Sequence, residues 1–158
     1  MIRAAVPADA LSLAALFNAL NSIDGDAPET PMTPAILLRD LICAEPKALL
    51  LVAEQDGTLA GFATGALIYD AVRAAWAMLL LDLYVAPEAR RRGHARGLMA
   101  CLAAEALRHG ARCLWWGVDE GDEEATLFYR AVGARSEGMF SGEIIEGAAL
   151  DALAKGAP

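Results

Sequence analysis

The sequence predicts one domain of the α/β (α+β) class over residues 1–158. The chain has the length of a single globular domain that can bury a core without disulfides. Strand-like and helix-like segments alternate along it, as in a sheet packed against helices. It has no repeat period and no polar low-complexity tract, which argues against a solenoid and against a disordered chain.

The first third of the chain predicts a strand over residues 2–6, a helix from residue 8, an acidic loop over 24–28 and a helix over about 33–44. Thr33 is a preferred N-cap residue and Pro34 suits the first helical position, so the second helix is expected to begin there.

The middle of the chain predicts strands over residues 47–54, 59–69 and 74–85. Asp56 and Gly57 separate the first two strands, and this dipeptide is typical of a tight hairpin turn. The third strand is apolar except for Asp82, as expected of a strand covered on both faces.

The last third predicts a helix over residues 94–109, a strand over 112–118, a helix over 123–132 and a strand over 139–145. Gly110 and Gly133 follow the two helices, where glycine commonly forms a left-handed C-terminal cap.

Charge and hydropathy exclude several classes of protein. The formal net charge of -8 argues against a nucleic-acid partner, because binding phosphates requires a basic face, and it suits a cationic substrate. No uncharged run has the roughly 18 residues of a membrane span, and Asp9 lies where a signal peptide would be apolar. We therefore expect a cytoplasmic protein without a membrane partner. The three cysteines lack metal-ligand spacing, so we expect reduced core thiols and no metal.

A basic turn lies between the apolar strand and the long helix. It contains four of the 13 lysines and arginines, and its residues are Arg90, Arg91, Arg92, Gly93, His94, Ala95 and Arg96. The first N–H groups of a helix lack internal partners, and small residues let a ligand approach the backbone, so this turn is suited to a pyrophosphate. The alternative is a solvated basic turn that binds nothing.

Arg90, Gly93 and Ala95 follow the pattern Arg/Gln-x-x-Gly-x-Gly/Ala, which resembles the acetyl-CoA pyrophosphate loop of the GCN5-related N-acetyltransferases (GNAT). Residues 122–134 resemble the second signature of that family. The resemblance implies a mixed, mostly antiparallel sheet of roughly six to seven strands, splayed at the acetyl-CoA site and flanked by about four helices. It also implies that the main chain of Leu83, Tyr84 and Val85 pairs with the pantetheine arm of acetyl-CoA.

Two residues of the second signature have implied roles. Tyr129 takes the position of the general acid that protonates the leaving thiolate, and a phenol suits this task because its ordinary pKa lies above that of a thiol. Its alternative role is a core aromatic residue. Asp122 replaces the family's usual asparagine, which contacts CoA, so it either keeps that contact or serves only as a helix N-cap.

The acceptor side resembles the diamine and polyamine acetyltransferases, which hold amines with carboxylates. Asp24 and Asp70 occupy matching positions, although each also suits a turn. Trp115 either binds an ammonium through its ring or packs on the sheet. The subfamily's usual base is replaced by Leu81, while Asp82, on the opposite face by strand alternation, is either a paired carboxylate of the core or reaches the site through a bulge or a water.

The expected activity is therefore transfer of acetyl from acetyl-CoA to a primary amine, such as a diamine, a polyamine or another small amine, by direct attack on the thioester. The alternatives are a non-catalytic acyl-CoA-binding or regulatory module and a protein N-terminal acetyltransferase. A homodimer is expected, since dimers are frequent in the family.

Overall fold

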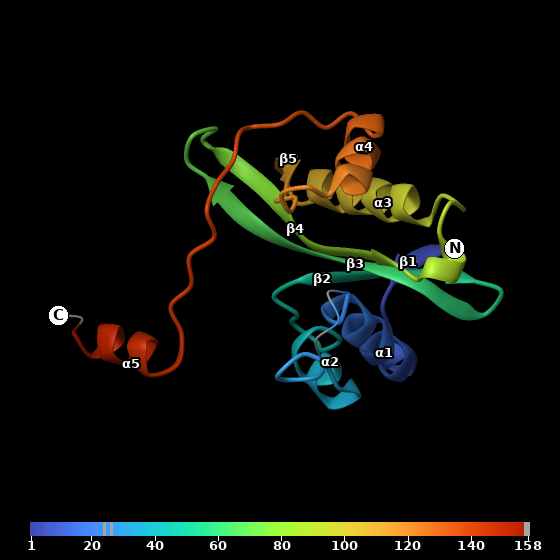
Figure 1. The fold of residues 1–158 in the computed structure, drawn as a ribbon, viewed down its shortest axis with the longest axis horizontal. Helices are drawn as coiled ribbons and strands as arrows, with labels where there is room; N and C mark the ends of the chain where they lie inside the picture. The colour runs from blue at the N-terminus through green and yellow to red at the C-terminus, as the bar shows by residue number, and fades with distance from the viewer. Residues whose placement is uncertain (24, 26, 157–158) are drawn as a thin grey trace. The chain divides into compact units, whose positions relative to one another are not determined.

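The computed structural model describes residues 1–23, 25 and 27–156 (Figure 1). The chain forms two compact units, Met1–Asp119 and Glu120–Pro158.

The first unit contains a mixed sheet whose strands follow chain order from one edge to the other. The strands are β1 (Ile2–Ala4), β2 (Leu49–Gln55), β3 (Thr58–Asp70), β4 (Ala75–Val85) and β5 (Ala111–Trp115). All neighbours are antiparallel except β4 and β5, which are parallel. This confirms the mixed, mostly antiparallel sheet. The described chain has five strands, so the expectation of six to seven was wrong.

The missing strand is the one predicted over residues 139–145, which have no regular structure. Gly138 has a φ of 108° and Gly142 lies inside the segment, and glycine in a strand interior weakens it. The apolar residues there also come as adjacent pairs, Met139–Phe140 and Ile144–Ile145, which does not give the alternation that one buried face requires.

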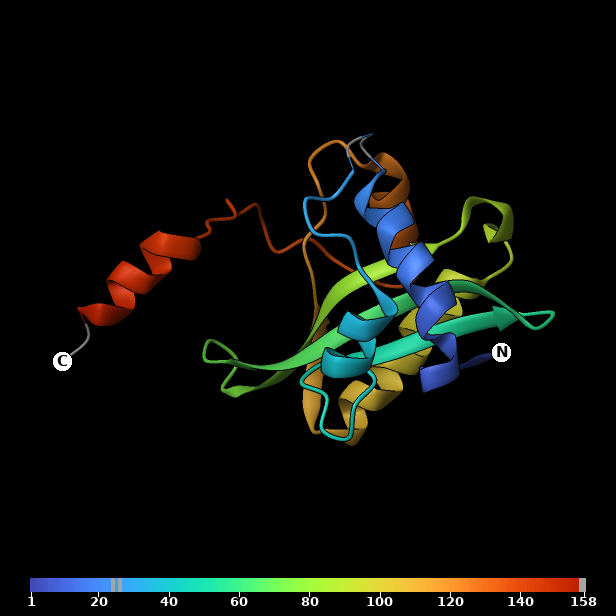
Figure 2. The same ribbon diagram turned by 90° about the horizontal axis from the view of Figure 1, so that it is seen from below.

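Helices cover both faces of the sheet in the first unit (Figures 1 and 2). On one face, α1 (Ala10–Asn21) lies beside α2 (Pro34–Asp40), and Phe17 stacks on Phe62 of β3 with ring centroids 4.0 Å apart. On the other face lies α3 (His94–Arg108), where a Cβ at Gly65 of β3 would come within 2.8 Å of Leu102. We call these the α1 face and the α3 face. The fully buried side chains with the largest volumes are Phe62, Leu13, Leu37, Met78, Leu98, Leu102 and Val52.

Turn and cap residues behave as their chemistry predicts. The Thr33 hydroxyl accepts a hydrogen bond from the Ile36 N–H at 3.3 Å. Asp56 and Gly57 have φ values of 53° and 77°, as a tight hairpin requires, and Gly110 caps α3 with a φ of 78°. The second helix, however, ends at Asp40 rather than near residue 44.

The second unit contains α4 (Glu123–Ala131) and α5 (Gly147–Lys155), and neither helix has a buried residue. The described chain has five α-helices, whereas about four were expected. The additional helix is α5. The prediction of one domain over residues 1–158 stays a prediction.

Two expectations about side chains and hydropathy can be compared with the structure. Cys43 is exposed, while Cys101 and Cys113 are half-buried, so the prediction of core thiols was wrong. Within residues 1–23, 25 and 27–156, no helix combines the length and the hydropathy that a membrane crossing requires.

An ion-pair network joins the N-terminal segment to the sheet. The Arg3 guanidinium donates to both carboxylate oxygens of Asp9, at 2.6 and 2.9 Å, and to Glu54 of β2 at 2.8 Å. Asp9 also accepts from the Val6 N–H at 2.8 Å. The hydrogen bond from Arg3 holds the pKa of Asp9 below its usual range.

We predict that Asp9→Asn lowers the free energy of unfolding at neutral pH by about 1 kcal/mol or more, because a half-buried charged hydrogen bond is lost. The pKa of Asp9 is lower in the folded than in the unfolded chain. Its contribution is therefore present above the unfolded pKa and disappears as the pH falls through the folded pKa. Denaturant unfolding of wild type and variant from about pH 7 to about pH 3 should show the difference shrinking. Asp40→Asn, which removes the exposed pair with Arg39, is the control with a smaller expected effect.

Candidate active site

The turn between β4 and α3 leaves backbone N–H groups unpaired. Beyond Val85 the chain forms a short 3-10 helix, Pro87–Ala89, and α3 then begins at His94. Arg91 and Gly93 have positive φ values of 61° and 84°, and no side chain of the described residues caps the helix at Gly93. The first N–H groups of α3 therefore lack helical partners.

Positive charge and open space accompany these N–H groups. The exposed arginines of the turn are Arg90, Arg91, Arg92 and Arg96. The Nε atom of Arg90 donates to the Val85 carbonyl at 3.2 Å, while His94 is held by Gln55 at 2.8 Å. A Cβ at Gly93 would meet no atom within 4 Å. Free amides, guanidinium groups and space at the backbone fit a diphosphate.

The end of β4 has a backbone edge that β5 does not cover. The parallel ladder pairs Met78 with Leu114 and Leu79 with Trp115, where β5 ends. From Leu80 to Val85, β4 continues with only β3 beside it among the described residues of this unit. Tyr84 is buried, with its ring 6.0 Å from that of Phe62. The side chain of Tyr84 thus belongs to the core, and a ligand would meet the main chain of this segment.

A β-bulge changes the position of Asp82 from the one that strand alternation predicts. Leu80 pairs with Gly65 and Asp82 pairs with Thr64, so Leu81 is the extra residue of β4. A bulge places two successive residues opposite one partner. Because Gly65 lies on the α3 face, Thr64 and Asp82 lie on the α1 face, together with Leu81. The prediction that Leu81 and Asp82 point to opposite faces was therefore wrong.

The carboxylate of Asp82 accepts a hydrogen bond from the Thr64 hydroxyl. Thr64 is 2% exposed, and no sequence motif singles it out. Its only signal in the sequence was a polar residue inside an otherwise apolar strand.

The predicted acceptor residues do not gather at one place. Asp70 pairs with Arg73 and accepts from its backbone N–H at 3.1 Å. It lies at the far end of β3, about 20 Å along the strand from Thr64 at roughly 3.3 Å per residue. Trp115 is half-buried at the end of β5, opposite Leu79. Asp24 lies outside the described residues.

In the second unit, Asp122 is the N-cap of α4, because its Oδ1 atom accepts from the Ala125 N–H at 2.9 Å. Tyr129 lies two turns further along the helix. Partial burial of the Tyr129 side chain, followed by the negative charge of Asp122, raises the pKa of the Tyr129 hydroxyl. The hydroxyl therefore stays protonated at neutral pH.

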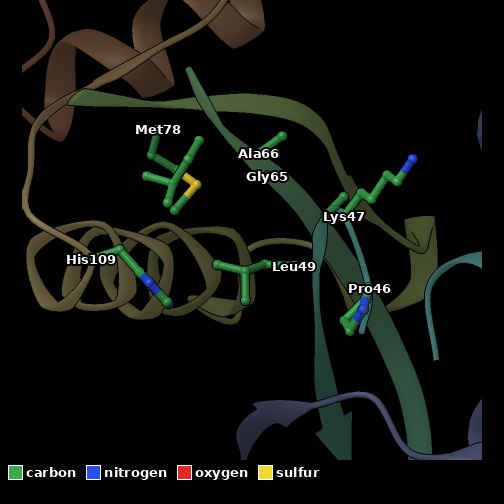
Figure 3. A pocket seen from close by; sticks show the side chains of 9 residues that line it. Pro46, Lys47, Leu49, Gly65, Ala66, Met78 and His109 are labelled. Atoms are coloured by element: carbon green, nitrogen blue, oxygen red, sulfur yellow. The ribbon is translucent and has the colours of Figure 1, made fainter. Parts of the chain in front are cut away.

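One hollow of the first unit was not predicted. It has a volume of about 180 Å³ and lies among β2, β3, β4 and the end of α3, with Lys47 and His109 as its basic residues. Figure 3 shows Lys47 directing its amine away from Met78 and Leu49. The other residues that line the hollow are apolar or small and come from separate parts of the sequence, so no motif marks the hollow. None of the predicted site residues lines this hollow.

Comparison with known proteins assigns the chain to a class. The model of the acetyltransferase (GNAT) family matches residues 13–134. An uncharacterized N-acetyltransferase of Bacillus subtilis, YhfO, is 27% identical over 139 residues, which is 88% of this chain and 92% of that protein.

Solved structures share the fold of this chain. An integron cassette protein from V. cholerae has a TM-score of 0.79 at 25% identity, covering 98% of this chain and 97% of its own. An aminoglycoside N-acetyltransferase in complex with CoA has a TM-score of 0.73 at 17% identity, covering 93% of this chain and 100% of its own. This second likeness concerns the fold alone.

The family match defines the protein as an acyltransferase. More particularly, the chain belongs to the acetyltransferase (GNAT) family and is an N-acetyltransferase. Acetyl-CoA is the co-substrate typical of that family.

We predict that Gly93→Ala weakens CoA binding by about 10-fold, or roughly 1.4 kcal/mol. An alanine at this position must adopt the left-handed backbone conformation of Gly93, which is strained for a residue with a Cβ. Its Cβ also occupies the space over the free N–H groups of α3. Gly110→Ala is the matched control, because Gly110 also has a positive φ and open space, at the other end of α3. Both variants should lose about 1 kcal/mol of stability, and calorimetric titration with CoA should separate them. Equal affinities for the two variants would contradict the assignment.

Proposed function

We propose that this enzyme acetylates a small primary amine by direct attack of the amine on the thioester of acetyl-CoA. The observation that carries the proposal is the uncovered edge of β4 from Leu80 to Val85, which leads into the uncapped N-terminus of α3. A strand edge offers hydrogen bonds to the amides of an extended ligand, and a helix N-terminus attracts phosphate.

In this proposal, residues of the first unit bind acetyl-CoA. The N–H groups of Gly93, His94 and Ala95, with the arginines Arg90, Arg91, Arg92 and Arg96, hold the diphosphate. The main chain of Leu83, Tyr84 and Val85 pairs with the pantetheine amides. The main-chain N–H groups near Val85 also stabilise negative charge on the thioester oxygen during attack.

The amine nitrogen forms the new C–N bond with its lone pair, and the C–S bond breaks with its electrons passing to sulfur. Tyr129 gives its hydroxyl proton to that sulfur and is reprotonated from solvent. Two protons leave the nitrogen, one before attack to free the lone pair and one from the tetrahedral adduct, through Asp82 or through water. One ammonium and one acetyl thioester thus give one amide, one thiol and one proton.

We predict that Tyr129→Phe lowers kcat by about 100-fold or more, with little change in CoA affinity, because a general acid acts on the chemical step. Tyr69→Phe, at a 59% exposed tyrosine of β3, is the matched control. Thiol release from acetyl-CoA should be followed with small amines, diamines, polyamines, amino acids and N-terminal peptides. An undiminished kcat in Tyr129→Phe would remove Tyr129 from the mechanism.

The same panel tests the alternatives. Tight acetyl-CoA binding without turnover on any acceptor would favour a non-catalytic acyl-CoA-binding module. Turnover restricted to peptides would favour a protein N-terminal acetyltransferase, and turnover restricted to diamines and polyamines would place the enzyme in that subfamily.

We also propose a homodimer, supported by the exposed apolar residues Leu150 and Leu153 of α5, which are 49% and 65% exposed. Light scattering should give the mass of two chains for the wild type and of one chain for Leu150→Lys with Leu153→Lys. A monomeric wild type would contradict the proposal.

A further inference from the structure

The α1 face of the sheet carries a single carboxylate in apolar surroundings next to the β4 bulge. Leu81 and Asp82 follow each other at the bulge, and Leu79 precedes them on the same face, opposite Trp115 of β5. Leu81 is 52% exposed, so the bulge presents an apolar side chain to solvent. This surface, which consists of Leu79, Leu81, Asp82 and Trp115, lies beside the uncovered edge of β4.

Thr64 fixes the orientation of the charged group on this surface. Its buried hydroxyl donates to the Oδ2 atom of Asp82. An ionised carboxylate offers about four acceptor positions, so one hydroxyl leaves capacity for a ligand. A primary ammonium, with three N–H donors, suits that capacity.

A second ammonium finds no counterpart on the described strands near Asp82. On the α1 face of β3, β4 and β5, the carboxylates are Asp82 and Asp70. Asp70 is paired with Arg73 at the hairpin end of β3. Leu81, which lies at the bulge next to Asp82, is aliphatic, and an aliphatic side chain penalises burial of a charge.

We infer that the acceptor is a monoamine with an apolar body, whose ammonium binds Asp82 and whose hydrocarbon part lies against Leu79, Leu81 and Trp115. This inference rests on the proposed function and names the substrate class of that site. Thr64 is a positioning residue that acts through Asp82.

The test uses two amines with the same carbon chain, hexylamine and hexamethylenediamine, which differ by the second ammonium. With wild-type enzyme and acetyl-CoA, kcat/KM for hexylamine should exceed that for the diamine by at least about 10-fold, because the diamine must place a charge on the apolar surface. A ratio near one, or one in favour of the diamine, overturns the inference.

A charge introduced at the bulge should reverse this preference. Leu81→Glu should raise kcat/KM for hexamethylenediamine and lower it for hexylamine. The half-exposed position makes the substitution compatible with folding, and circular dichroism would check it. Leu107→Glu, at a 72% exposed leucine of α3, is the matched control and should leave the ratio unchanged. An unchanged ratio in Leu81→Glu would place the acceptor elsewhere.

The positioning role of Thr64 has its own readout. Thr64→Val should raise KM for hexylamine more than it lowers kcat, and Thr64→Ser should restore KM, because the hydroxyl rather than the methyl group holds Asp82. A Thr64→Ser enzyme as impaired as Thr64→Val would show that Thr64 acts through packing alone.

Thiol release with the two amines distinguishes a failure of the proposed function from a failure of this inference. Thiol release with the diamine but little with hexylamine refutes the inference and leaves amine acetylation standing. No thiol release with any amine refutes both.

Discussion

The backbone hydrogen bonds that β4 leaves unmade are the constraint on which the site depends. A strand inside a sheet normally pairs on both edges, because a buried N–H or C=O without a partner costs free energy. Here β5 stops at Trp115 while β4 runs on to Val85, and the chain then turns into a helix whose first amides are also free. Two sets of backbone groups without a partner strand or a helical partner therefore follow each other along the chain, and of these the Val85 carbonyl accepts from Arg90. An extended ligand with amides at one end and phosphates at the other satisfies both sets.

Close packing on the opposite edge keeps this part of β4 in place. A Cβ at Gly61 of β3 would collide with the carbonyl oxygen of Tyr84, so the absence of a side chain lets the two backbones approach. Tyr84 is buried beside Phe62, which in turn stacks on Phe17 of α1. The strand is thus held by β3 and α1, and its other edge needs no partner strand for support. One edge of β4 therefore packs in the core, while its other edge is open to a ligand.

Local chemistry made some elements predictable from the sequence and long-range pairing made others unpredictable. The N-cap at Thr33, the hairpin at Asp56 and Gly57 and the cap at Gly110 depend on residues within one turn, and each was confirmed. The basic turn was recognised because its residues are contiguous. The bulge at Leu81 depends instead on the register between β3 and β4, and the bond between Thr64 and Asp82 joins residues 18 positions apart. The strand predicted over residues 139–145 depended on apolar content, which does not specify a partner strand.

The basic turn and the carboxylate of Asp82 lie on different parts of the first unit. The chain carries a formal net charge of -8, which attracts an ammonium and repels a polyphosphate at long range. At physiological salt, however, exposed charges further apart than roughly 8 to 10 Å are largely screened. A diphosphate that approaches the N-terminus of α3 therefore responds mainly to Arg90, Arg91, Arg92 and Arg96 and to the helix dipole. An amine at the acceptor surface that we propose on the α1 face responds to Asp82, which lies among the apolar side chains of Leu79, Leu81 and Trp115. An overall acidic protein can thus attract an anion locally at the basic turn, while the carboxylate of Asp82 stays available to the proposed cationic acceptor.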